Sequence, residues 1–204
     1  MTSPVPPAAD EPVYDDRVYR SPMAMVTGVL MLALVAWLCG DALVRGSGSA
    51  PWIAGSVLLC AVPLIVAFTL RPAVFANDNR MRVRNPFRTV ELPWAAVDAV
   101  RAGYSAEVLA EGAKYQLWSI PVSLRERKKA NRRAGRAAAA ETPKNAADAA
   151  QAGADKAVHE LMELAERGAS RAGAQGSVRV RWSYEIIAPA AIGAVALIVL
   201  LATR

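Results

Sequence analysis

Three long apolar runs set the main limit on what this chain can fold into. They cover residues 23–44, 52–70 and 186–203, and Asp41 is the only charged residue within them. A helix needs about 20 apolar residues to cross the roughly 30 Å hydrocarbon core of a bilayer. The rest of the chain is too small to enclose three helices that are apolar all round. The runs therefore predict three transmembrane helices rather than a buried helical core.

The flanks of these runs support membrane insertion. Tyr19, Trp52, Trp182 and Tyr184 lie at their edges, and Trp and Tyr favour the headgroup level of a bilayer. The first run is longer than the roughly 7–15 apolar residues of a secretion signal, and its flank is acidic rather than basic. We therefore expect an uncleaved helix there.

The distribution of basic residues predicts the orientation of the chain. Residues 45–51 (RGSGSAP) form a short turn, so that residues 23–70 make a transmembrane helical hairpin. Arginines gather before the first run, after the second and before the third, and basic residues stay on the cytoplasmic side. We expect a multi-pass protein of the bacterial inner (cell) membrane, with the N-terminus and residues 71–185 in the cytoplasm.

Outside the apolar runs, the composition and the hydrophobic pattern of the sequence change. Residues 1–20 are acidic and rich in proline, which predicts a disordered tail. Residues 71–122 contain about six short apolar stretches separated by turn residues. This pattern predicts a small antiparallel β domain.

The segment RMRVRNPFRTVEL, residues 80–92, predicts a β-hairpin with one apolar and one charged face. Pro86 and Phe87 form its expected turn, and the expected pairs are Arg84–Thr89, Val83–Val90, Arg82–Glu91 and Met81–Leu92. Because Arg82 then lies opposite Glu91, Arg80, Arg84 and Arg88 are expected to be the freer charges. The candidate core residues are Met81, Val83, Val90, Leu92, Trp94, Val97, Val100, Leu117 and Trp118.

Two further segments follow the β pattern. Residues 123–152 form a basic and Ala-rich linker, either a solvated segment or a polybasic patch for anionic lipid. Residues 153–168 predict an amphipathic helix. His159 is expected at the solvent edge of this helix. The expected apolar face consists of Val158, Leu161, Met162 and Ala165.

The chain contains no motif of a known chemistry. Phosphate-binding, dinucleotide-binding, zinc-protease and serine-hydrolase patterns are missing. Its only histidine is His159, and Cys39 and Cys60 lie within the apolar runs, where they are expected to act as apolar fillers. The sequence therefore predicts no catalytic residue, no cofactor and no metal site, and the basic segments lack the interleaved aromatic residues of a nucleic-acid site.

Residues 70–103 resemble the bacterial PH-like domain, a family typified by a low-molecular-weight mycobacterial antigen. The matching motifs are RP after the hairpin, VRNPFR, and LPW. The resemblance implies two packed antiparallel sheets closed by a C-terminal helix. Whether residues 153–167 form that cap stays open, because the linker separates them from the last strand. Arg71, Arg80 and Arg82 loosely resemble the basic residues with which eukaryotic PH domains hold phosphoinositides.

We therefore expect a fold of three membrane helices plus a small antiparallel PH-like domain with an amphipathic helix. The leading hypothesis is a non-enzymatic membrane protein that presents this cytoplasmic module to a protein partner or an anionic lipid. The alternative is an accessory subunit of a transporter or envelope complex, which would interact through small residues such as Gly28, Gly40, Gly55, Ala191 and Gly193. The candidate contact residues are Arg80, Arg84, Arg88, Arg125, Arg127, Lys128, Lys129, Arg132, Arg133 and Arg136.

Overall fold

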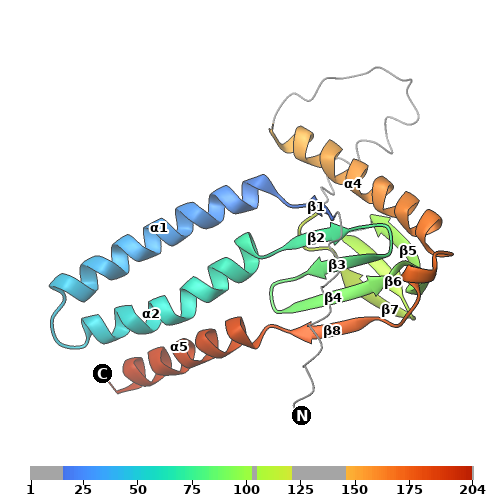
Figure 1. Cartoon of the computed structure of the whole chain (residues 1–204). Coiled ribbons are helices and arrows are strands. Elements are labelled where there is room, and N and C mark those ends of the chain that lie inside the picture. Colours follow the sequence, from blue (N-terminus) through green and yellow to red (C-terminus); the bar gives the residue numbers. More distant parts are fainter. Residues whose placement is uncertain (1–15, 103–104, 121–145, 204) are drawn as a thin grey trace, which may run out of the picture.

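The computed structural model describes residues 16–102, 105–120 and 146–203, with the backbone alone at 146–152 and at 154. Three long helices extend from one side of a β domain (Figure 1). The basic part of the expected linker lies outside the described residues. It holds the candidate contacts Arg125, Arg127, Lys128, Lys129, Arg132, Arg133 and Arg136.

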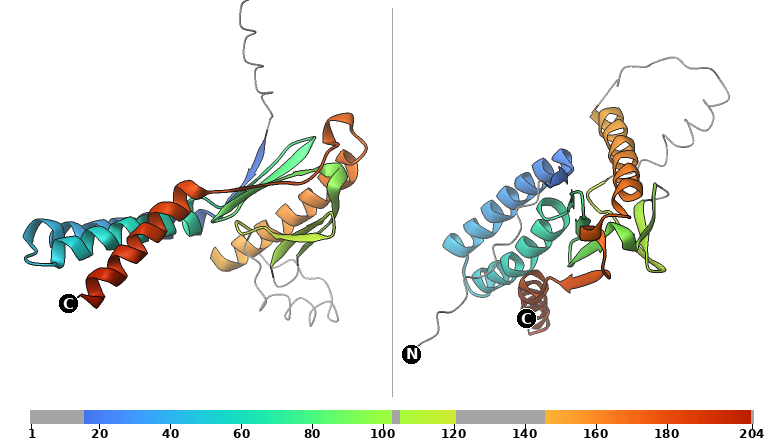
Figure 2. Two further views of the ribbon diagram at one scale, coloured as in Figure 1. Left: turned by 90° about the horizontal axis from the view of Figure 1, so that it is seen from below. Right: turned by 45° about the vertical axis from the view of Figure 1, so that its right-hand side comes forward.

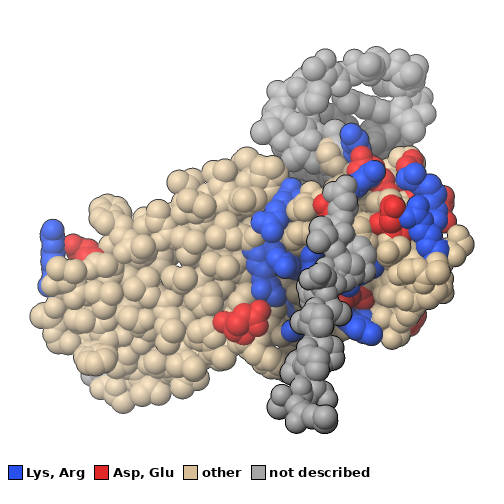
Figure 3. Space-filling model, viewed as in Figure 1, with Lys and Arg blue, Asp and Glu red and all other residues tan. Residues whose placement is uncertain are grey.

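The three helices correspond to the three apolar runs. They are α1 (Pro22–Arg45), α2 (Ala50–Ile65) with its π-helical end η1 (Val66–Leu70), and α5 (Tyr184–Ala202). All three are long and apolar enough to cross a membrane. α2 contacts both of the others (Figures 1 and 2). Between its two ends, the visible helix surface is uncharged (Figure 3), as expected for a surface that faces lipid.

Asp41 lies at that far end. Its carboxylate is 3.3 Å from Nε of Arg45, one helical turn further on, and both side chains are exposed. The pair sits beside the short loop between α1 and α2. This geometry agrees with a place at the membrane interface, where a charge keeps its water.

Two glycines allow the helices to approach one another closely. A Cβ on Gly28 of α1 would collide with the side chain of Thr69, and one on Gly193 of α5 would lie 2.8 Å from the carbonyl carbon of Leu59 on α2. Gly40 and Gly55 have open space instead. Two of the small residues are therefore used for packing within the chain.

The β domain consists of two antiparallel sheets. The larger sheet has the order β1-β2-β3-β4-β8, and the smaller has the order β5-β6-β7. The strands of the first are β1 (Arg17–Tyr19), β2 (Ala73–Ala76), β3 (Arg80–Arg84), β4 (Arg88–Pro93) and β8 (Arg179–Trp182). Those of the second are β5 (Val97–Ala102), β6 (Ala106–Ala110) and β7 (Ala113–Gln116). The remaining elements are η2 (Trp94–Ala96), α4 (Ala146–Gly168) and η3 (Ala172–Ala174).

The expected register of the hairpin β3–β4 is confirmed. The structure contains all four expected pairs, Arg84–Thr89, Val83–Val90, Arg82–Glu91 and Met81–Leu92. A shift of one residue would turn the apolar side chains of one strand to solvent, so that burial of one face fixes the register.

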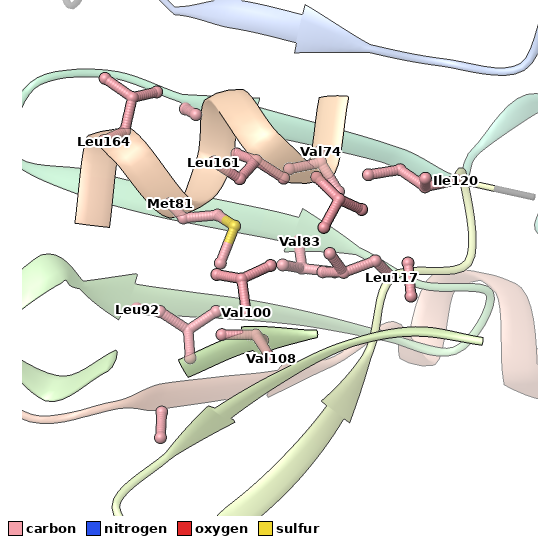
Figure 4. Packing of buried hydrophobic residues seen from close by; sticks show 14 of the residues in the cluster. Val74, Met81, Val83, Leu92, Val100, Val108, Leu117, Ile120, Leu161 and Leu164 are labelled. Carbon is pink, nitrogen blue, oxygen red and sulfur yellow. The ribbon is translucent and has the colours of Figure 1, made fainter. Parts of the chain in front are cut away.

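The core lies between the two sheets and under α4 (Figure 4). Leu161 and Leu164 of α4 join Val74, Met81 and Val83 of the larger sheet there. The helix therefore caps the domain. The sequence left this open, because the linker separates the helix from the last strand. It begins at Ala146, earlier than expected.

Trp94 connects this cap to the sheets. Its indole is fully buried, and its Nε1 donates a 2.7 Å hydrogen bond to the carbonyl oxygen of Asn77. Gly168 at the end of α4 packs against the Trp94 ring, where a Cβ would collide with the indole. A larger residue at position 168 would therefore push the helix end off the core.

Three expectations about individual residues are wrong. Trp118 is 44% exposed and Met162 is 40% exposed, although both were expected in the core. Trp118 packs on Phe68 at the end of α2 instead, and Ala157 and Leu164 complete the apolar face of α4. Residues 17–19 belong to the tail that was expected to be disordered, yet they form β1. The open edge of β2 supplies its backbone partners, and a strand this short has no apolar period of its own.

We expect Gly193→Ala to destabilise the helical part of the protein by about 1–3 kcal/mol, since an added methyl group in a tight contact forces the backbones apart. The measurement is the melting temperature of the full chain in a mild detergent. Gly55→Ala is the matched control, because nothing lies within 4 Å of a Cβ at that position. Equal melting temperatures for the two variants would show that α2 and α5 do not pack as described.

Candidate functional site

The outer face of the larger sheet carries a group of arginines. Alternation along β3 places Met81 and Val83 in the core and Arg80, Arg82 and Arg84 on the other face. Phe75 of β2 pairs with Arg82 and lies on the same face. The guanidinium groups of Arg82 and Arg84 lie 4.8 Å and 4.9 Å from the centre of its ring. Phe75 therefore holds two cations beside one another.

Arg71 joins this sheet to two of the membrane helices. It directly follows Leu70, the last residue of η1, and its Nη1 lies 3.3 Å from Oε1 of Glu185 in the first turn of α5. Its other nitrogens donate to the carbonyl oxygen of Asn85 and to the hydroxyl groups of Thr89 and Ser183. One side chain thus connects α2, the β3–β4 turn, β4 and α5.

A cleft of about 330 Å³ opens beside Arg71, between the outer face of the sheet and the start of α5. Figure 3 shows Lys and Arg side chains gathered where the domain meets the helices. The cleft therefore lies at the level where the chain leaves the predicted membrane. Its lining residues are Arg71, Arg82, Arg84, Thr89, Glu91, Arg181, Trp182, Ser183 and Glu185.

Arg84 is a cation of this cleft that is not balanced by an acid. Among the described residues, no carboxylate lies within ion-pair distance of it, and its described contact is the ring of Phe75. Burial, followed by the positive charges of Arg82, Arg71 and Arg20, lowers the pKa of the Arg84 guanidinium. The group stays protonated at every physiological pH, so the crowding leaves a positive potential there.

The ion pairs on this face of the sheet differ from those that the hairpin register predicts. Arg82 is opposite Glu91, but its Nη2 lies 3.0 Å from Oδ2 of Asp16, just before β1. Glu91 pairs with Arg80 instead, at 3.7 Å. Arg80 is therefore not a free charge, as was expected, because a longer side chain reaches diagonally across the strands.

Arg88 does not share the surface of the other expected contacts. Arg88 lies on the same side of β4 as Val90 and Leu92, the buried residues of this strand. Its guanidinium lies 5.7 Å from the ring centre of Tyr115 on β7, in the smaller sheet. The expectation that the arginines of the hairpin lie together is therefore wrong for Arg88, since on β4 it is Thr89 and Glu91 that share the face of Arg84 and Arg82.

Of the residues that line the cleft, Arg84 alone was among the candidate contacts predicted from the sequence. Arg71, Arg181 and Ser183 lie up to 112 residues apart in the chain, and the pairing of β8 with β4 brings them together. The signal for Arg181 was the alternation of SVRVRW, residues 177–182, which is compatible both with a strand and with a simple lead into the third helix. Arg71 was noted for its loose resemblance to the phosphoinositide motif.

An aromatic cluster fixes the neighbouring edge of the domain to α2. The ring centre of Phe68 in η1 lies 5.3 Å from that of Phe87 in the β3–β4 turn and 5.6 Å from that of Trp118. Asn85 of the same turn donates to the carbonyl oxygen of Gln116. The turn is thus held between the helix and the smaller sheet, so that the cleft keeps its place relative to the helices.

Comparison with known proteins agrees with this architecture. Residues 71–154 match the bacterial PH domain family. The match covers the two sheets from β2 to β7 and the start of α4, and it identifies this part as a bacterial PH-like domain. No curated protein and no solved structure matched the chain.

The loose resemblance to a phosphoinositide motif does not produce one site. Arg71 lies at the helix end of the sheet, beside Thr89. Arg80 lies at the opposite end of β3, where it pairs in register with Pro93. The two residues therefore face different openings, and only Arg71 and Arg82 line the cleft.

Tyr19 attaches β1 to the rest of the domain. Its phenol donates a 2.8 Å hydrogen bond to Oε2 of Glu160 on α4. Burial, then the hydrogen bond and charge of Glu160, raises the pKa of Tyr19 to about 12. Since this pKa lies above the ordinary value of 10.0, the bond is fully present below pH 10.0 and is lost as the pH rises through about 12.

We expect Tyr19→Phe to loosen β1. A hydrogen bond contributes about 1 kcal/mol net, so the amides of residues 17–19 should exchange with solvent about fivefold faster at neutral pH. Hydrogen-exchange mass spectrometry measures this, with Tyr184→Phe as the control because that phenol is exposed. In an ultraviolet titration of phenolate, the tyrosine that ionises near pH 12 should be missing from the variant. Identical titration curves would contradict the described environment of Tyr19.

Proposed function

We propose that this chain is a non-enzymatic protein of the bacterial inner membrane, whose cytoplasmic PH-like module binds anionic lipid at the surface of that membrane. The observation that carries the proposal is the arginine-lined cleft at the junction of the domain and the helices. A soluble PH domain must first find a membrane. Here the membrane helices keep the cationic face beside the bilayer. The local concentration of lipid headgroups is therefore high, and even a weak affinity is sufficient for binding.

The contacts at the junction support a fixed rather than a loosely tethered module. Arg71, Phe68 and Asn85 connect the sheet to α2, to α5 and to the smaller sheet. The described residues include no group of His, Cys, Asp or Glu that could hold a metal ion. A binding role fits a domain whose buried side chains are mostly apolar and whose arginines line a surface cleft.

The alternative role, an accessory subunit that interacts through its helices, has less support. Gly28 and Gly193 were candidates for contact with another protein, but both pack within the chain. Gly40 and Gly55 have open space and remain as candidates. A protein partner could bind at the cleft in place of a lipid, and the lipid experiment below distinguishes these two ligands.

The proposed orientation is tested by cysteine labelling in intact cells. With Cys39 and Cys60 replaced by Ala, Ser47→Cys in the loop after α1 should react with a membrane-impermeant maleimide added outside. Ser177→Cys, before β8, should react only after the cells are permeabilised, because the domain is proposed to lie in the cytoplasm. Both positions are exposed. The opposite pattern would place the domain outside and contradict the proposal.

Lipid binding is tested on the full chain. We expect the protein in mild non-ionic detergent, offered equal amounts of phosphatidylglycerol and phosphatidylcholine, to retain the anionic lipid preferentially in native mass spectrometry. The preference should shrink as the salt concentration rises, because salt screens exposed charges. Equal retention of the two lipids would refute the lipid role and favour a protein partner for the module.

A further inference from the structure

We propose that the cleft is a phosphate clamp, in which Arg84 and Arg181 hold one phosphate group from two sides above Thr89. The inference rests on the proposed lipid function and adds the chemical group that is bound and the residues that bind it. The lipid headgroup is the source that the position of the cleft favours.

The strand register places the two arginines on either side of a hydroxyl group. Arg84 of β3 pairs with Thr89 of β4, and Thr89 pairs with Arg181 of β8. The three residues therefore form a row across neighbouring strands, each step about 4.8 Å. The side chains of Arg84 and Arg181 can close over the short side chain of Thr89, and all three line the cleft.

The next row of the same sheet differs from this one in the residue between its two arginines. It consists of Arg82, Glu91 and Arg179, in the same order across β3, β4 and β8. Here the residue between the two arginines is a carboxylate. In the first row the corresponding residue is Thr89, which is neutral and shorter. The first row thus lacks the anion that the second contains.

The chemistry of the open row suits a phosphate group. Guanidinium groups bind phosphate oxygens through two parallel hydrogen bonds. The hydroxyl of Thr89 accepts from Arg71, which leaves its own proton available for a phosphate oxygen. The start of α5 lines the same cleft, and the N-terminus of a helix favours negative charge. Glu185 limits this effect, but it is paired with Arg71.

The position of the cleft points to a lipid as the source of the phosphate. Arg71 directly follows the last residue of η1, and Ser183 directly precedes α5. Both lie where a membrane helix ends, which is the depth of lipid headgroups. Trp182 lines the cleft and is 54% exposed, as is typical of an aromatic side chain at that depth.

The test uses the full chain in non-ionic detergent and calorimetric titration with short-chain phosphatidic acid. Arg84→Gln and Arg181→Gln should each weaken binding by about tenfold, the expected effect of losing a charge-assisted contact. Arg88→Gln and Arg179→Gln should change it by less than about twofold, since these arginines do not line the cleft. Arg88 is the sharper control because it lies at the same end of the same sheet, on the other face.

Thr89→Glu gives a test in the opposite direction. A carboxylate at this position would lie between Arg84 and Arg181 in the strand register, so that phosphatidic acid should no longer bind while the melting temperature of the protein rises. A variant that loses binding and also melts earlier than the wild type would contradict the clamp.

The ligand arms separate the possible outcomes. Inorganic phosphate and glycerol 3-phosphate are titrated beside short-chain phosphatidic acid and short-chain phosphatidylcholine. Binding of inorganic phosphate, glycerol 3-phosphate and phosphatidic acid with equal affinity and with the same dependence on Arg84 would support the clamp and assign a soluble phosphate compound as its source. Equal weakening by Arg84→Gln and Arg88→Gln would overturn the clamp and leave a diffuse attraction to anionic lipid. Equal binding of the phosphatidic acid and the phosphatidylcholine would refute the clamp together with the proposed function.

Discussion

The short distance between strands and membrane helices is the constraint on which the rest of this structure depends. β1 is separated from α1 by two residues, η1 from β2 by two, and β8 from α5 by one. Three strands of one sheet therefore end where three apolar helices begin, and the sheet cannot tilt or turn relative to them. Most membrane-tethered domains have linkers that permit such movement. In this chain the sheet is a direct continuation of the membrane part.

This constraint decides where the arginines lie. The alternation of RMRVR puts three of them on one face of β3, but the direct connection of β8 to α5 brings Arg181 and Ser183 beside that face. Arg71 then connects both groups to the end of η1. The same arginines on a freely tethered domain would form an ordinary solvated surface. Beside the helix ends, they line a polar cleft.

Local patterns in the sequence were sufficient for much of the fold. The hairpin register followed from apolar alternation, because a one-residue slip would expose either Met81 and Val83 or Val90 and Leu92. The PH-like domain followed from the strand pattern and the motifs around VRNPFR. Expectations failed where a residue's partner comes from a distant segment. Arg82 pairs with Asp16 rather than with Glu91, and Trp118 packs on Phe68 at the end of α2 rather than in the core. The three-residue strand β1 exists only because β2 offers an open edge.

By itself, the sequence determined three membrane helices, their connection to a small antiparallel domain, and the two faces of the β3–β4 hairpin. Each of these depends on the length or the period of apolar residues, which neighbouring positions decide. The tertiary structure alone decided that α4 caps the core and that Arg84, Thr89 and Arg181 form one row. It also placed Arg88 beside Tyr115, away from that row. These arrangements depend on contacts between segments that are distant in the chain, and no local period specifies which partner a distant segment will join.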